Sequence, residues 1–298
     1  MGSRTFRRTA LSTLMTVAAA TAAVLAPGGG ASAASPVPAW ATDGLSMIHP
    51  GVLTITKNQS CTSNFVFLDG DNHAYLGQAA HCSGLGGATE TNGCDSRSMP
   101  IGTPVALGAS GFKGKMVYNS WLTMQERGEK NKDACANNDF ALVSIPKAAL
   151  SKVNPSIPVF GGPTDLRKTD LDTGEAVLSY GNSPLRGGLS VLSPKQGVSL
   201  GSERNGWGHV VYTATPGVPG DSGSGFIDTH GRAFGVLSTL SLVPIPGANG
   251  VADLAKCLEY AQAHSGIAGL RLAKGTKAFA PGALPLAGAL LPGGTAGS

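Results

Sequence analysis

Charged residues are scarce in this sequence. Lys, Arg, Asp and Glu make up 13% of its 298 positions, and no stretch combines closely spaced basic residues with aromatic ones. Nucleic-acid-binding surfaces need such basic clusters, so no nucleic-acid partner is expected. Glycine, in contrast, occurs 43 times. This composition is more typical of a β protein rich in turns than of a helical bundle.

Patterns for metal binding and for membrane insertion are also missing. No two of the five cysteines have the C-x-x-C spacing of a zinc site, so we expect no metal and no other cofactor. Downstream of residue 33, no apolar run is long enough to span a bilayer. We therefore expect no transmembrane segment in that part of the chain.

The first 33 residues have the pattern of a secretory signal peptide. Three arginines within residues 4–8 precede an apolar stretch at 10–26, and the small residues ASA end at Ala33. A transmembrane anchor is the alternative, but the apolar stretch is short and contains Thr and Ser. Cleavage after Ala33 leaves 265 of the 298 residues and lowers the formal charge from +4 to +1, because three arginines are removed. The protein is therefore expected to be secreted and extracellular.

Both ends of the exported chain are expected to lie outside the folded core. Residues 34–50 are predicted to form an N-terminal extension. Residues 275–298 consist almost entirely of Gly, Ala, Pro and Leu, and prolines and glycines interrupt any helix there. A disordered tail is the prediction for this segment, and a role in surface attachment is the alternative.

Short apolar runs alternate with turn residues throughout the predicted folded domain at 51–274. The turn DGDN at 69–72, for example, separates CTSNFVFL from HAYLGQAA, which is a strong hairpin signal. Runs of this kind recur about every 10 residues, and this spacing favours a β-sandwich or β-barrel. A proline-rich connection at 146–163 splits them into two groups, at about 51–150 and about 158–274.

One segment, Asn249–His264, has the spacing of a helix. Apolar residues recur on one of its faces, namely Val251, Leu254, Cys257, Leu258 and Ala261. A buried cysteine behaves as a small apolar residue, so Cys257 is the best candidate for the unpaired one of the five. An exported protein meets oxidising conditions, in which the remaining cysteines are expected to form disulfides.

Three separate residues could together carry out nucleophilic chemistry. Ser222 lies in the stretch VPGDSGSGF, His81 follows two alanines, and Asp139 precedes an apolar run. Each has a simpler explanation on its own: a Gly-Ser loop, a packed core histidine and a turn before a strand. A serine hydroxyl becomes a good nucleophile when a base takes its proton, and an aspartate can hold a histidine in the tautomer that does so. Glycines at 220 and 223 would let backbone N–H groups face a developing oxyanion.

In this order, the motifs QAAHC (78–82), DFALV (139–143) and GDSGSG (220–225) resemble those of chymotrypsin-like serine peptidases of the bacterial secreted type. The resemblance implies an all-β fold of two six-stranded antiparallel β-barrels with a C-terminal helix, and a site between the barrels. It also implies a secreted, monomeric serine endopeptidase that hydrolyses peptide bonds of proteins or peptides through an acyl-enzyme.

The resemblance further implies roles for individual residues. His81, Asp139 and Ser222 would form the catalytic triad, and the amides of Gly220 and Ser222 would form the oxyanion hole. Ser238, in the run FGVLSTL, would contact the aspartate and line the substrate cleft.

Two disulfides are implied by the same resemblance. Cys61 would pair with Cys82 and brace the histidine loop. Cys94 would pair with Cys135 and staple the charged loop that precedes Asp139.

The nucleophile motif departs from the family pattern in two ways. Ser224 replaces the usual second glycine after the serine, a change that removes no catalytic group. No Ile-Val-Gly-Gly terminus occurs near residues 40–55, although family zymogens use such a terminus to pair with the aspartate that is Asp221 here. Asp221 therefore needs another partner, which the sequence does not identify.

The substrate pocket departs from the trypsin-like pattern as well. Pro216 stands where trypsin-like members have an acid, and Leu240 stands where a glycine is frequent at the pocket wall. We therefore predict a shallow apolar pocket, formed by Pro216, Ser238 and Leu240, that does not select Lys or Arg.

Two other classes of function compete with this interpretation. An α/β-hydrolase would use Ser222, Asp253 and His264 in that order, but the full G-x-S-x-G frame and the alternation of strands and helices are missing. A secreted, non-catalytic binding module on a serine-peptidase scaffold is the second alternative.

Overall fold

The computed structural model describes residues 36–87, 91–240 and 245–283, together with Met1 and Gly2. The chain divides into two units, Met1–Ala33 and Ala34–Ser298, and the second of these contains the elements described below. The predicted cleavage after Ala33 and residues 284–298 of the predicted tail lie outside the described residues.

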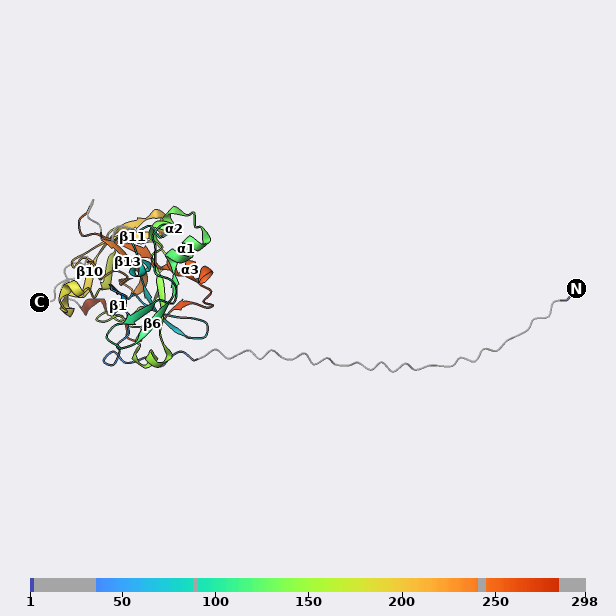
Figure 1. Ribbon diagram of the computed structural model, residues 1–298, viewed down its shortest axis with the longest axis horizontal. Coiled ribbons are helices and arrows are strands. Elements are labelled where there is room, and N and C mark those ends of the chain that lie inside the picture. Colours follow the sequence, from blue (N-terminus) through green and yellow to red (C-terminus); the bar gives the residue numbers. More distant parts are fainter. Residues whose placement is uncertain (3–35, 88–90, 241–244, 284–298) are drawn as a thin grey trace. The chain divides into compact units, whose positions relative to one another are not determined.

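Seven strands from the first half of the chain and one from near its C-terminal end form a curled antiparallel sheet of eight strands (Figure 1). Its strands are β1 (Leu53–Thr56), β2 (Gln59–Thr62), β3 (Val66–Leu68), β4 (Ala74–Gln78), β5 (Pro104–Leu107), β6 (Lys113–Asn119), β7 (Ala141–Ser144) and β15 (Arg271–Leu272), in the order β15-β3-β4-β7-β6-β5-β1-β2. In β6, alternation is visible: the buried Gly114, Met116 and Tyr118 alternate with the more exposed Lys113, Lys115 and Val117.

The second half contains a closed barrel. Its strands are β8 (Asp165–Leu166), β9 (Ala176–Tyr180), β10 (Pro194–Glu203), β11 (Gly208–Thr213), β12 (Gly225–Asp228), β13 (Arg232–Leu240) and β14 (Asn249–Asp253), in the order β12-β9-β10-β11-β14-β13-β8. An additional β12–β13 pairing closes six of these strands into an antiparallel barrel, and β8 joins β13 in parallel. The predicted all-β fold class is therefore confirmed: the second half closes into the predicted six-stranded barrel, and the first sheet is a curled half-barrel of eight strands.

One apolar core joins the two sheets. It contains Phe65 and Phe140 from the first half, Ile227 and Val236 from the second, and Leu258 from the C-terminal helix. The strand Arg271–Leu272, assigned from the sequence to the second barrel, instead pairs with β3 of the first sheet. The chain thus returns to its first half after the helix.

The C-terminal helix α3 (Leu254–His264) begins later than the periodicity predicts. Residues 249–253 pair as β14, and the Asp253 side chain then caps the helix by accepting the N–H of Lys256. The predicted apolar face is confirmed within the helix, because Leu254, Cys257, Leu258 and Ala261 are buried.

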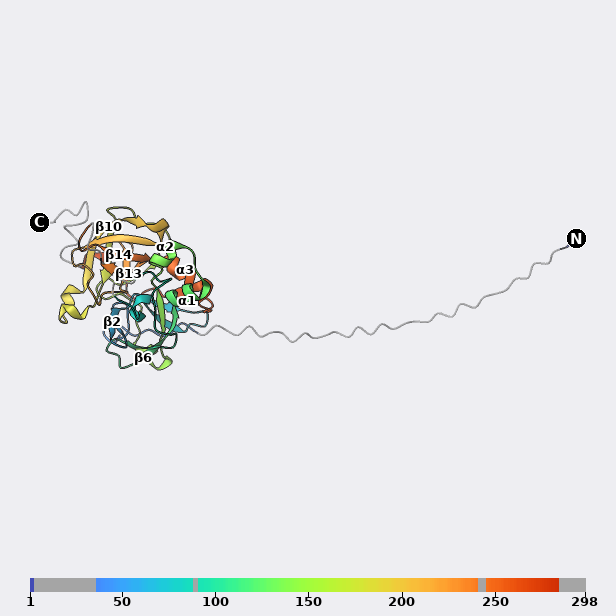
Figure 2. The same cartoon turned by 45° about the horizontal axis from the view of Figure 1, so that its top comes forward.

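Two further helices, α1 (Ser120–Arg127) and α2 (Lys132–Asn137), were not predicted. The run KMVYNSWLTM, expected to be one strand, changes conformation at Asn119, whose side chain accepts the N–H groups of Trp121 and Leu122 and caps α1. Both Figure 1 and Figure 2 place α1, α2 and α3 close together on one side of the two sheets. Short 3-10 helices complete the described elements: η1 (Ala80–Ser83), η2 (Lys147–Lys152), η3 (Pro184–Arg186), η4 (Ser190–Leu192), η5 (Arg204–Gly206) and η6 (Pro281–Ala283).

Residues 275–283, predicted to belong to a disordered tail, pack against the folded body instead. Phe279 packs against the core that joins the sheets, and the Ala280 N–H donates to the Phe160 carbonyl at 2.7 Å. The aromatic side chain gives this part of the segment an apolar anchor. Within the described ranges, no helix has the length and apolar character that a bilayer crossing requires.

Candidate active site

A cleft of about 720 Å³ collects side chains from both halves of the molecule. Gln59 lies in β2 of the first sheet, and His81 lies in the short helix η1 that follows β4. Val218, Ser222 and Leu240 come from the second half. Two of the three predicted triad residues, His81 and Ser222, therefore line the same cleft.

Strand pairing brings His81 and Asp139 together. Gln78 at the end of β4 pairs with Ala141 at the start of β7, so the residues just after β4 lie beside those just before β7. His81 Nδ1 lies 2.6 Å from Asp139 Oδ2, and the His81 backbone N–H donates to Asp139 Oδ1 at 2.9 Å. One register of the sheet therefore bridges their sequence separation of 58.

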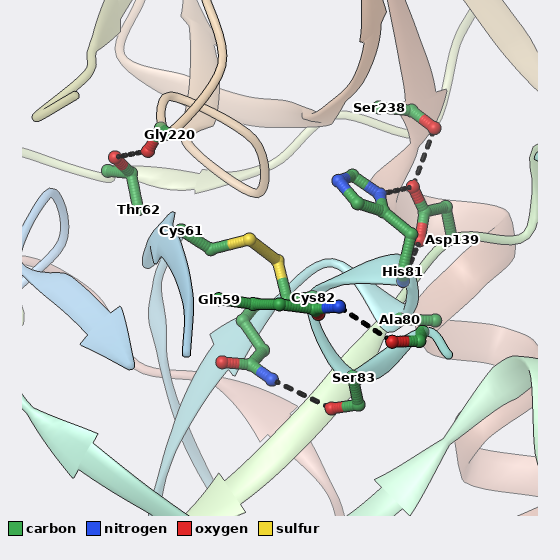
Figure 3. Close-up of a disulfide and its surroundings, with 12 residues drawn as sticks. Gln59, Cys61, Thr62, Ala80, His81, Cys82, Ser83, Asp139, Gly220 and Ser238 are labelled. Atoms are coloured by element: carbon green, nitrogen blue, oxygen red, sulfur yellow. Dashed lines mark hydrogen bonds and ion pairs between the residues drawn. A yellow bond between two sulfur atoms is a disulfide. The ribbon is translucent and has the colours of Figure 1, made fainter. Parts of the chain in front are cut away.

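The Asp139 carboxylate has a third donor. Ser238 Oγ donates to Asp139 Oδ2 at 2.6 Å, and Figure 3 shows His81 and Ser238 reaching the same oxygen from different directions. A buried carboxylate is costly unless it is hydrogen-bonded, and Asp139 meets this condition on both oxygens. The contact between Ser238 and the aspartate is the one that the family resemblance implies.

The charge states of this pair follow from burial and mutual attraction. Burial raises the pKa of Asp139, but the positive charge and hydrogen bonds of His81 outweigh it and lower that pKa. Burial lowers the pKa of His81, but the negative charge and hydrogen bond of Asp139 outweigh it and raise that pKa. An ionised carboxylate only accepts hydrogen bonds, so neutral His81 carries its proton on Nδ1 and keeps Nε2 free as a base.

The loop that carries Ser222 is held by the first sheet. From β2, the Thr62 backbone N–H donates to the Ser222 carbonyl at 2.8 Å. Thr62 Oγ1 donates to the Gly220 carbonyl at 2.8 Å (Figure 3). Gly220 has a φ of 97°, and a Cβ there would lie 2.8 Å from Pro184 Cδ. Glycine is therefore required at this position by both backbone conformation and space.

Asp221 has two cationic partners that the sequence did not reveal. Lys195 Nζ lies 2.9 Å from Asp221 Oδ2, and Arg186 Nη2 lies 2.5 Å from the same oxygen. The backbone N–H groups of Ser183 and Val218 donate to the two carboxylate oxygens. Lys195 and Arg186 lie 26 and 35 residues from Asp221 in the chain, and neither stands in a recognisable motif, so no local signal could have found them.

Burial governs the electrostatics of this cluster. It raises the pKa of Asp221, but the Arg186 hydrogen bond and the Lys195 charge outweigh it and lower that pKa. For Lys195, whose side chain is 0% exposed, burial outweighs the attraction of Asp221, and the pKa is lowered. Gly181 permits this packing, because a Cβ there would collide with Asp221 Oδ1.

The structure places two of the three predicted pocket residues in the cleft. Ser238 and Leu240 line the cleft, whereas Pro216 is not among its described lining residues. The Pro216 carbonyl accepts hydrogen bonds from Arg186 at 3.0 Å and from Lys195 at 3.3 Å, the two cations that also contact Asp221 beside Ser222.

Asn249 is a pocket residue that the sequence did not identify. Its buried side chain accepts the N–H of Gly217 at 2.8 Å and donates to the carbonyls of Gly217 and Thr239 at 3.2 Å. It therefore ties together two walls of the cleft. Its position inside a predicted helix concealed this role.

The disulfides Cys61–Cys82 and Cys94–Cys135 are both present, and Cys257 is free and buried. Ligand atoms of Cys61, His81 and Cys82 lie within 4.8 Å of one another. Both sulfur atoms belong to the disulfide, so this group offers a single imidazole rather than a thiolate metal site.

The α/β-hydrolase alternative has no geometric basis. Asp253 caps α3 and contacts His209 Nε2 at 3.0 Å, while the His264 ring lies 4.5 Å from that of Tyr260. Neither Asp253 nor His264 is among the described residues that line the cleft with Ser222.

No protein-family model and no curated protein matches the sequence. The solved structures to which the chain is similar are chymotrypsin-like bacterial serine proteases. Protease A of Thermobifida fusca is 18% identical, with 76% of this chain and 99% of that chain covered and a TM-score of 0.49. The chymotrypsin of Cellulomonas bogoriensis is 15% identical, with 76% and 98% covered and a TM-score of 0.47. The Nocardiopsis protease NAPase is 18% identical, with 76% and 98% covered and a TM-score of 0.44.

Proposed function

We propose that this protein is a secreted serine endopeptidase that uses Ser222, His81 and Asp139 as its catalytic triad. The observation that carries the proposal is the His81–Asp139 pair, whose histidine lines the same cleft as Ser222. The signal-peptide pattern before Ala34 and the two disulfides support export, and we propose that the mature protein acts as a monomer on proteins or peptides.

In the proposed mechanism, His81 Nε2 takes the proton of Ser222 Oγ as that oxygen attacks the scissile carbonyl carbon. The negative charge moves to the carbonyl oxygen, which accepts hydrogen bonds from the Gly220 and Ser222 amides. Asp139 stabilises the imidazolium, which then protonates the leaving amine and leaves an acyl-enzyme. Water, deprotonated by His81, hydrolyses that ester and restores Ser222.

We further propose that the substrate side chain before the cleaved bond is small or medium-sized and apolar. The described lining of the cleft contains no Asp, Glu, Lys or Arg. Val218, Leu237 and Leu240 supply apolar surface, and the bridging Asn249 limits the depth between the walls. A cleavage profile on a peptide library that is dominated by Lys or Arg would contradict this specificity.

A fluorophosphonate probe tests the triad, because it reacts with activated serines. The wild type should be labelled and Ser222→Ala should not. Ser224→Ala is the matched control, since this neighbouring side chain is buried and should not affect labelling. A folded wild-type protein that stays unlabelled would support the non-catalytic binding module instead.

A further inference from the structure

The hydroxyl group of Ser183 makes an unusual contact behind the nucleophile loop. Ser183 Oγ donates to the Pro219 carbonyl at 2.5 Å and accepts the Leu185 N–H at 3.1 Å. The residue is 3% exposed, so little water can compete for these contacts. A hydroxyl group has a single proton, and here that proton is committed to Pro219.

This contact determines where the neighbouring amide points. The Pro219 carbonyl and the Gly220 N–H belong to one peptide unit, which is planar and trans, so they point in opposite directions. Ser183 holds the Pro219 carbonyl on its own side of the loop, so the Gly220 N–H points away from Ser183. Gly220 itself lines the cleft. Among the described residues, the Gly220 N–H has no hydrogen-bond partner, so it is available to a ligand.

The next two peptide units are held in the same manner. Thr62 Oγ1 donates to the Gly220 carbonyl at 2.8 Å, and the Ser224 N–H donates to the Asp221 carbonyl at 3.0 Å. The second of these bonds orients the Ser222 N–H by the same rule of planarity. Ser183 differs from the other two contacts because it acts on the peptide unit that precedes a glycine.

Glycine makes that peptide unit easy to turn. Without a Cβ, Gly220 can adopt conformations on both sides of φ = 0, so rotation of the Pro219–Gly220 peptide has a low intrinsic cost. A rotated peptide would direct a carbonyl oxygen, rather than an N–H, towards the cleft. The native orientation therefore depends on whatever binds the Pro219 carbonyl.

We propose that Ser183 is a positioning residue of the oxyanion hole, whose hydroxyl group holds the Gly220 N–H towards the oxygen of the reacting carbonyl. This role rests on the proposed function of the cleft. Ser183 touches neither the substrate nor the reacting atoms, and it acts through the peptide that does.

Kinetics of Ser183→Ala with a neutral peptide substrate test the proposal. Loss of an oxyanion-hole donor costs about 10²–10³-fold in kcat, and loss of the group that orients it should cost about 10–100-fold, with KM changed less than about twofold. Ser183→Thr keeps a hydroxyl group and should recover most of kcat. Wild-type kcat in folded Ser183→Ala would overturn the proposal.

Ser179→Ala is the matched control. Ser179 is also a buried serine, and its Oγ donates to the Gly225 carbonyl at 2.8 Å, away from the described lining of the cleft. It should lower the melting temperature about as much as Ser183→Ala but leave kcat within about twofold of the wild type. An equal loss of kcat in both variants would assign the effect to stability and overturn the positioning role.

Crystal structures of the wild type and Ser183→Ala separate this proposal from the proposed function. The Pro219–Gly220 peptide should have one orientation in the wild type and should turn, wholly or in part, in the variant. An unchanged peptide overturns the role of Ser183 even if the wild type is a peptidase. If the fluorophosphonate probe does not label the wild type, the proposed peptidase function is rejected. The orientation of the Pro219–Gly220 peptide in the two crystal structures still shows whether Ser183 controls the Gly220 N–H.

Discussion

At the scale of single residues, the imidazole of His81 lies between a buried carboxylate and the cleft. Its side chain is 25% exposed, whereas Asp139 behind it is buried and receives three hydrogen bonds. This asymmetry keeps the aspartate ionised and leaves one imidazole nitrogen for the substrate side. This arrangement supports the proposed role of His81 as a general base with a fixed tautomer.

The pH dependence of hydrolysis should report His81. Because Asp139 raises its pKa above the ordinary value of 6.5, kcat/KM should fall in acid with a midpoint above pH 6.5, as the base becomes protonated. Asp139→Asn should move the midpoint to lower pH and reduce kcat by about four orders of magnitude. The measurement is kcat/KM against pH, with an NMR titration of the imidazole for the slow variant. A rate that stays flat down to pH 4 would exclude His81 as the base.

Lys195 should contribute strongly to stability. Lys195→Met leaves the buried Asp221 with one cation fewer and should lower the free energy of unfolding by about 3 kcal/mol. The control is Lys274→Met, whose ion pair with Asp165 is 66% and 64% exposed and should contribute less than about 1 kcal/mol. Urea unfolding gives the free energy of unfolding of both variants. Equal losses would show that burial does not make the Lys195–Asp221 pair more stabilising than an exposed pair.

At the scale of elements, local patterns predict strands better than they predict helices. Apolar alternation and the turn at 69–72 correctly indicate the β3–β4 hairpin. The start of α1 after Asn119 is not predicted from the sequence, because this capping residue lies within an apolar run that also fits a strand. In the same way the residues of β14 continue the apolar periodicity of α3, and their pairing with β11 and β13 is not visible in the sequence.

The two disulfides should differ in their effect on catalysis. Replacing Cys94 and Cys135 by serine opens a link across 41 residues and should cost about 2–4 kcal/mol of stability with kcat retained. Replacing Cys61 and Cys82 should cost a similar amount and should also lower kcat, because Cys82 adjoins His81. Thermal unfolding and peptide hydrolysis of both double variants test this contrast. An equal loss of kcat in the two would show that the bracing of His81 is not specific.

At the scale of the whole molecule, the candidate site exists because two sheets meet. Thr62 of the first sheet holds the loop of Ser222, and Ser238 of the second holds the carboxylate of Asp139. Each half therefore supports a proposed catalytic group of the other. The core that contains Phe65 and Ile227 keeps the halves in this arrangement.

The segment that returns after α3 should add to this cohesion. A chain that ends at Lys274 lacks Phe279 and the hydrogen bond from Gly162 to Lys277, and should unfold at a lower temperature than a chain that ends at Ala283. The expected difference is about 1–3 kcal/mol, since a half-buried aromatic ring and several hydrogen bonds are lost. Activity at 25 °C should be equal, because none of these residues is among the described lining of the cleft. Identical melting temperatures would contradict the prediction.

Features that depend on short-range constraints could be predicted without a structure. A nucleophile turn needs glycine at Gly220, and the strand end before His81 and the strand start after Asp139 have clear local patterns, so these residues could be selected as catalytic candidates. The alternation of short apolar runs with turn residues was likewise enough to predict an all-β fold. Family resemblance supplied the disulfide pairs, which spacing alone left open.

Several other contacts between groups that are distant in the chain emerged from the tertiary structure alone. Lys195 and Arg186 reach Asp221, Asn249 bridges the cleft walls, and Ser183 reaches the Pro219 carbonyl. Barrel closure makes these contacts possible, because it brings β9, β10, β12, β13 and β14 around one loop. Such contacts depend on register and packing of the whole barrel, and these are properties that no local stretch of residues encodes. Pro216 illustrates the same point: it is not among the described residues that line the cleft, and its carbonyl accepts hydrogen bonds from Arg186 and Lys195.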